Sequence, residues 1–205
     1  MKKSMFFFVL FIVGSLSAQV HKNSRFWSVS TNVGGHAFFS HFANNSSIRP
    51  YTYVNTNVIY KFTPVLGIRP GIHYHNFTNG TDNVNYTNMS IDIVADASQF
   101  GTTGYREKKG EMSVLMHSGF GFSTMWKDRL TTGDPFIKGN DDMMSVSFGV
   151  TSRYRINRRM LINADVTYVT HLLQDQFFDF SDRKARGAGG GFMRFSFGLT
   201  YELIR

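Results

Sequence analysis

Apolar and polar residues alternate with a period of two along much of the chain, most clearly in residues 51–77. Two alternating arms flank the break at Thr63-Pro64 in this stretch. Because successive side chains of a strand point to opposite faces, the pattern predicts two antiparallel strands joined by a tight turn. The face opposite the apolar one carries Tyr53, Asn55, Asn57, Lys61, Arg69, His73 and His75.

The same alternation recurs along the rest of the chain and predicts an all-β, eight-stranded antiparallel up-and-down barrel. The further strands are expected at residues 25–39, around 88–93, and at 111–126, 144–156, 162–172 and 192–203. Strands of about 11 residues are long enough to cross a bilayer when tilted. We expect a β-bulge at Gly34-Gly35, because paired glycines in a strand often mark one.

Side-chain volume indicates which face of this barrel is outside. The interior of an eight-stranded barrel is only wide enough for side chains to fill it. One face carries a large set of rings: Trp27, Tyr60, Phe62, Tyr74, Phe120, Phe122, Trp126, Phe148, Tyr154, Tyr168, Phe195, Phe197 and Tyr201. These rings would not fit inside, so we predict a transmembrane barrel with a small, polar lumen rather than a soluble barrel with its apolar face turned in.

The connections between strands alternate in length. The turns after residues 62 and 156 are short, whereas 40–50, 78–85, 127–142 and 174–191 are expected to be long loops. Short periplasmic turns and long outer loops give this rhythm, which places both termini in the periplasm. The link at 98–110 is longer than the pattern requires.

The N-terminal segment is typical of an export signal. Lys2 and Lys3 precede an apolar run at 5–13 and a small-residue zone ending at Ala18. We therefore predict a signal peptide at 1–19 and an outer membrane barrel domain at 20–205, in the cell outer membrane. The chain has no cysteine, which excludes disulfides and thiolate metal sites.

Charge indicates the kind of partner this chain meets. The formal net charge is +8, but no run of Lys and Arg is interleaved with aromatic residues, so we expect no nucleic acid partner. Contact of the basic side chains with anionic outer membrane lipid headgroups or lipopolysaccharide fits better, as does plain solvation of the barrel rims, which is the simpler interpretation.

Four stretches make the chain resemble the outer membrane protein A (OmpA-like) family of Bacteroidetes: YKFTPVLGIRPGIHY, MSVLMHSGFGFS, YRINRRMLINADVTYV and FMRFSFGLTYEL. The resemblance covers nearly all of the mature chain. It implies an eight-stranded outer membrane barrel that depends on periplasmic chaperones and the barrel assembly machinery during biogenesis. Family members often continue into a peptidoglycan-binding domain, which we do not expect here because the sequence stops after the last strand.

Seven charged residues fall on the lumen face: Arg69, Asp92, Arg153, Arg155, Asp165, Arg194 and Glu202. We expect Asp165 to reach Arg153 or Arg155 on one neighbouring strand and Arg194 on the other. The arrangement predicts a structural ion network that fills the lumen, with a gate for small solutes as the alternative.

Histidines suggest two further hypotheses. His36, His75 and His171 point inward near the outer mouth, where they could form a belt that binds a transition metal or responds to pH. His117-Ser118 invites comparison with lipid-modifying barrels that use a serine nucleophile and a histidine base. Neighbours on a strand point to opposite faces, so this pair does not predict an enzyme, and we expect neither a resident metal nor a cofactor.

These observations favour a structural or surface-interaction protein of the outer membrane without a wide pore. A channel for small or hydrophobic solutes is the alternative. A surface adhesin and a lipid-modifying enzyme are further alternatives.

Overall fold

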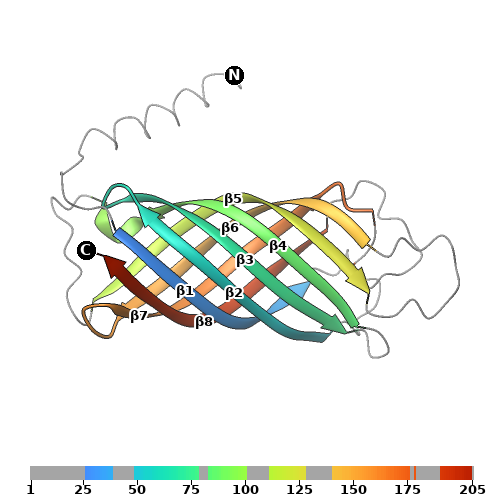
Figure 1. Cartoon of the computed structure of the whole chain (residues 1–205), viewed down its shortest axis with the longest axis horizontal. Helices are drawn as coiled ribbons and strands as arrows, with labels where there is room; N and C mark the ends of the chain where they lie inside the picture. The colour runs from blue at the N-terminus through green and yellow to red at the C-terminus, as the bar shows by residue number, and fades with distance from the viewer. Residues whose placement is uncertain are drawn as a thin grey trace, which may run out of the picture.

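The structure, a computed structural model, describes residues 26–38, 49–78, 83–100, 111–127, 140–175, 178 and 190–204. Eight strands form one closed barrel in which sequence neighbours pair antiparallel and β8 returns to β1 (Figure 1). The elements are β1 (Phe26–Phe38), β2 (Arg49–Lys61), β3 (Leu66–Thr78), β4 (Asn83–Asp96), the 3₁₀ helix η1 (Ala97–Gln99), β5 (Met112–Lys127), β6 (Asn140–Arg155), β7 (Met160–Leu172) and β8 (Gly191–Ile204). The predicted fold class is confirmed.

The two faces of the sheet are those that alternation predicts. Phe120, Phe122 and Phe197 lie on the outside and are 69, 71 and 70% exposed, whereas His75 and Thr167 point inward and are fully buried. In a closed barrel each side chain points either into the lumen or to the outside, so the position of a residue in the two-residue repeat of its strand decides whether it is buried. The outside is therefore apolar and aromatic along the length of the strands, as expected of a wall that contacts lipid.

Aromatic rings mark the end of the barrel where the chain terminates. Trp27 and Tyr60 pack there with ring centroids 4.5 Å apart. Tyr154 and Tyr201 lie near the same end and are 43 and 42% exposed. Tryptophan and tyrosine rings prefer the boundary between hydrocarbon and water. These four rings therefore lie where an aromatic girdle is expected at the membrane interface.

The expected bulge at Gly34-Gly35 is wrong. β1 pairs with β2 and with β8 through Gly34 without a change of register, and the shift lies between Trp27 and Ser28 instead. A Cβ atom on Gly34 would lie 1.9 Å from the carbonyl oxygen of Phe195 on β8. Glycine is present here because the two strands approach closely, which the sequence pattern does not distinguish from a bulge.

Two tight turns close one end of the barrel, where the C-terminus also lies (Figure 1). Between β2 and β3, the hydroxyl of Thr63 accepts a hydrogen bond from the backbone N–H of Leu66 at 2.7 Å. Between β6 and β7, the side-chain oxygen of Asn157 accepts from the N–H groups of Arg159 and Met160, both at 2.9 Å. Both predicted short turns are confirmed.

The connections at the opposite end differ in part from expectation. β3 extends to Thr78 and β4 begins at Asn83, so their connection is shorter than the 78–85 loop we expected. The link after β4 lies at the other end, beside the turn between β2 and β3; it begins with η1. Its residues 101–110 lie outside the described part, as do the proposed signal peptide at 1–19 and most of the other long connections. Among the described residues, no helix is long and apolar enough to cross a membrane.

The exposed apolar wall generates a prediction about depth. Ile91 lies at the middle of β4, whereas Ile156 lies at the turn after β6. We expect Ile91→Arg to lower the free energy of unfolding in bilayers by about 2–4 kcal/mol and Ile156→Arg to lower it by about 0–1 kcal/mol, because the cost of a cation depends on its depth in hydrocarbon. Denaturant titration in lipid vesicles measures both, and equal costs would contradict a membrane-spanning wall.

Candidate functional site

The lumen is the candidate site because the buried charged residues converge there. All seven charged residues that the sequence assigned to this face point inward and are at most 5% exposed. The structure adds three lumen residues that the sequence analysis did not include in the network: Lys61, Asp96 and His117. Buried charges are tolerated when they are paired and hydrogen-bonded, so the partners of each decide what the lumen can do.

A cluster at mid-height joins opposite walls. Arg69 of β3 donates to Asp92 of β4 from Nη2 at 2.6 Å and from Nε at 3.0 Å, and its Nη1 lies 3.5 Å from Asp165 of β7. The ring of His117 of β5 lies between them, with Nδ1 2.7 Å from Nη2 of Arg69 and Nε2 3.0 Å from Asp165. Thr151 also donates to Asp165, at 2.6 Å. These contacts brace the barrel across its lumen.

The expected partners of Asp165 were therefore wrong. Thr151, not an arginine, lies directly opposite Asp165 on β6, and Ser196 lies opposite it on β8. Arg153 instead extends to Asp96 of β4, 2.9 Å away. Asp165 receives its charged partner, Arg69, from β3 across the lumen, whereas its neighbour on β6, Thr151, is uncharged.

Two ion clusters lie nearer the end with the short turns. Asp96 accepts from both Lys61 and Arg153. Arg155 donates to Glu202 through both terminal nitrogens, at 3.0 and 2.6 Å, which is the bidentate geometry that strengthens such pairs. The buried residues Ile59, Val94 and Leu115 form a small apolar cluster at this end. Together they close the inner part of the lumen.

Arg194 differs from the other lumen cations. It is 2% exposed, and among the described residues it forms no ion pair with a carboxylate. Its guanidinium carbon lies 5.5 Å from the centroid of the Tyr53 ring, a cation–π contact, and its Nε has no hydrogen-bond partner. The expectation that Arg194 belongs to the ion network is not met by these contacts.

An apolar cluster fills the outer end of the lumen, and we call it the outer plug. It consists of Phe77, Val84, Tyr86, Met125, Met143, Val169, Phe178 and Phe192. This corrects the expectation of a lumen that is small and polar throughout. Each of these strand residues has the parity of the lumen face, so the change from polar to apolar near the strand ends was the available signal.

The three histidines of the proposed metal belt surround this plug. The centroids of His36, His75 and His171 lie 5.8, 5.2 and 5.6 Å from that of Phe192. Phe192 thus packs against all three rings, and the part of the chain that the structure describes contains no group of three or more histidines and carboxylates able to hold a metal ion. The arrangement is an aromatic cluster that includes imidazoles, which does not support the metal hypothesis.

His117 and Ser118 lie on opposite faces, as alternation predicts. His117 belongs to the mid-height cluster, and the hydroxyl of Ser118 donates to the backbone oxygen of Ser147 at 3.0 Å on the outer wall. The two side chains therefore do not form a nucleophile and base pair.

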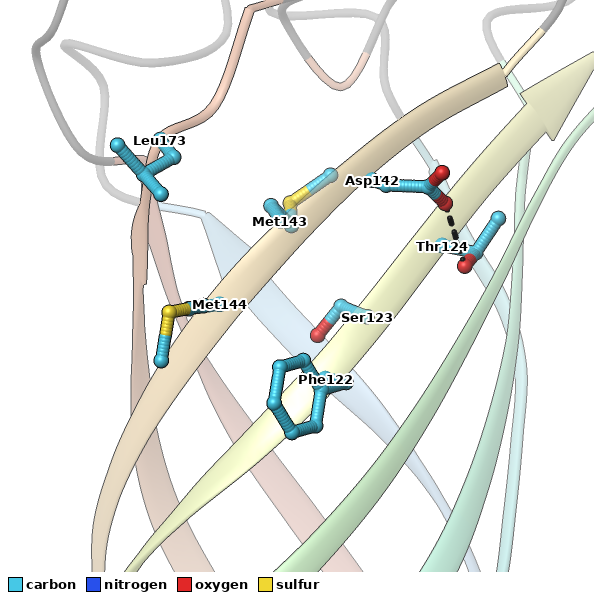
Figure 2. A pocket seen from close by; sticks show the side chains of 7 residues that line it. All are labelled: Phe122, Ser123, Thr124, Asp142, Met143, Met144 and Leu173. Carbon is cyan, nitrogen blue, oxygen red and sulfur yellow. Dashed lines mark hydrogen bonds between the residues drawn. The ribbon is translucent and has the colours of Figure 1, made fainter.

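The described part of the outer wall carries hollows between side chains. One of about 350 Å³ lies over Gly119 and is lined by Ile93, Phe120 and Phe148 among others. A second of about 250 Å³ lies near the outer rim, where Thr124 donates to Asp142 above the apolar side chain of Phe122 (Figure 2). The wall changes from apolar to polar there, as expected at the upper boundary of a lipid-contacting belt.

A closed antiparallel barrel with an apolar outer wall and a charged, filled lumen defines the class of small transmembrane β-barrels. Solved structures with this fold include neisserial surface protein A (7% identity, 87% of this chain and 97% of that one, TM-score 0.55). A major outer membrane protein of Thermus thermophilus is also similar (10%, 88% and 100%, 0.53), as is Ail of Yersinia pestis (10%, 87% and 99%, 0.50). No protein-family model and no curated protein matches the sequence. At these identities the likeness is one of fold.

The bidentate pair at the inner end generates a second prediction. Glu202→Gln leaves the buried guanidinium of Arg155 without its carboxylate, so we expect it to lower the free energy of unfolding by about 3–5 kcal/mol. The double variant Arg155→Met with Glu202→Gln removes both charges and should cost much less. A double-mutant cycle in detergent measures the coupling, and additive costs would show that the pair does not act as a unit.

Proposed function

We propose that this chain is a structural or surface-interaction barrel of the cell outer membrane, of the OmpA-like kind, with no conducting pore. The observation that carries the proposal is the lumen packed with side chains: the outer plug lies at one end, and the clusters around Arg69, Asp96 and Glu202 lie along the rest of it. A side chain that is both buried and paired can move aside for a solute only if its ion pair is broken. The lumen therefore braces the barrel rather than serving as a passage.

The outer wall supports the proposed location. Its exposed aromatic and aliphatic side chains match a hydrocarbon environment, and its similarity in fold to outer membrane proteins agrees with this. In this account residues 1–19 direct export and are removed, and periplasmic chaperones and the barrel assembly machinery deliver the chain to the membrane. The excess of basic residues makes anionic headgroups and lipopolysaccharide the expected partners at the rims.

Fewer observations support the three alternative functions, which are a channel, an adhesin and a lipid-modifying enzyme. A channel for small solutes would require the Arg69–Asp92 cluster to act as a gate. An adhesin would act through the long connections, and Ail, solved in complex with the heparin analogue sucrose octasulfate, shows that a barrel of this fold can bind a polyanion. A lipid-modifying enzyme would need a nucleophile and base on one face, an arrangement that His117 and Ser118 do not provide.

The location is tested by electrophoresis of membrane fractions. A folded transmembrane barrel resists detergent at room temperature, so unheated samples from outer membranes should migrate differently from boiled ones. Recovery in the soluble periplasmic fraction, with no change on boiling, would contradict the proposal.

The absence of a pore is tested by conductance. Purified protein inserted into planar bilayers should give no stable single-channel openings, because both ends of the lumen are closed by packed side chains. A general-diffusion porin inserted under the same conditions is the positive control. Regular ohmic openings that a charge-removing change at Arg69 alters would favour the channel alternative instead.

A further inference from the structure

Among the described residues of the lumen, Arg194 differs from the other buried cations because it has no carboxylate partner. Lys61, Arg69, Arg153 and Arg155 each lie within 4.0 Å of a buried carboxylate. Arg194 is buried to the same degree, yet within the described chain no carboxylate reaches it. A buried guanidinium, which stays protonated, is costly unless an opposite charge compensates it.

The described residues around Arg194 include imidazoles but no carboxylate. His36 lies directly opposite Arg194 on β1, and the His75 ring lies 5.5 Å from that of His36. His75 is fully buried, and neither of its ring nitrogens has a hydrogen-bond partner among the residues that the structure describes. A neutral imidazole carries one N–H group, so His75 and the Nε–H of Arg194 are two unused donors in the same part of the lumen.

We propose that Arg194 and His75 form a binding site for a small inorganic anion of the size of chloride, enclosed beneath the outer plug. The anion supplies the negative charge that Arg194 lacks and accepts hydrogen bonds from Arg194 and from the N–H of His75. Tyr53, which stacks on His75 with a centroid distance of 4.5 Å and lies beside the guanidinium, forms one wall of the site.

The packing around the site restricts the size of the ligand. The ring of His75 lies 5.8 Å from Phe77, 5.0 Å from Tyr86 and 5.2 Å from Phe192, centroid to centroid. Rings at these separations are in contact with His75, so the site is enclosed by packed side chains and a ligand much larger than a single ion, such as an organic acid, is excluded. A water molecule in the same place would bring no charge, so it would leave Arg194 uncompensated.

Chloride dependence of stability tests the site. The full-length protein folded in detergent is unfolded by heat at increasing chloride, with ionic strength held constant by sodium gluconate, whose anion is too large to enter. An anion that binds only the folded state should raise the midpoint by roughly 3–5 °C for each tenfold increase in chloride above its dissociation constant.

Two variants separate the site from general salt effects. Arg194→Gln should lose the chloride dependence and, without chloride, unfold at or above the midpoint of the unaltered protein because the uncompensated charge is gone. Arg158→Gln, in the exposed turn after β6, makes the same charge change outside the lumen and should keep the dependence. The proposal is wrong if Arg194→Gln retains the dependence, or if the unaltered protein shows none.

A second measurement does not depend on the variant folding. Bromide replaces chloride in crystals of the unaltered protein, and its anomalous signal locates it. The proposal requires a peak within about 3.5 Å of the nitrogens of Arg194 and His75, the range of a long hydrogen bond. Bromide found only at the protein surface would overturn it.

Discussion

Closure of the sheet through the pairing of β1 with β8 is the constraint on which the rest of the structure depends. An open sheet would present unpaired backbone groups at its edges, which hydrocarbon does not tolerate. Once β1 returns to β8, each strand residue has a fixed choice between lipid and lumen. The aromatic wall, the buried charges and the apolar plug are three consequences of that choice, and each follows from the chemistry of the side chains that share a parity.

This dependence explains why the faces could be predicted from the sequence. Val54 and Tyr53 are neighbours in the chain, yet the first lies on the outer wall and the second is buried in the lumen. Alternation alone separates them. The volume of the rings then indicates which face is outside, because the interior of so small a barrel cannot hold them. The tight turns at Thr63 and Asn157 could also be predicted from the sequence, since local residue chemistry determines them.

The contacts inside the lumen could not be predicted in the same way. The cation that pairs with Asp165, and the cations that pair with Asp96, depend on strand tilt and on how far each side chain extends across the barrel. Parity states that Arg153 points inward, but not that it extends to Asp96 rather than to Asp165. Phe192 shows a different difficulty: its parity placed it in the lumen, but only the closed structure shows that its ring packs against three histidines.

Lipid accessibility measured residue by residue along β5 tests the central claim most directly. The chain has no cysteine, so single cysteines can be introduced for spin labels without removing native ones. Labels at residues 116, 118, 120 and 122 should be accessible to oxygen dissolved in the bilayer, and labels at 115, 117, 121 and 123 should be protected. The opposite phase would show that the apolar face lines the interior, and loss of the two-residue period would show that β5 does not span a bilayer.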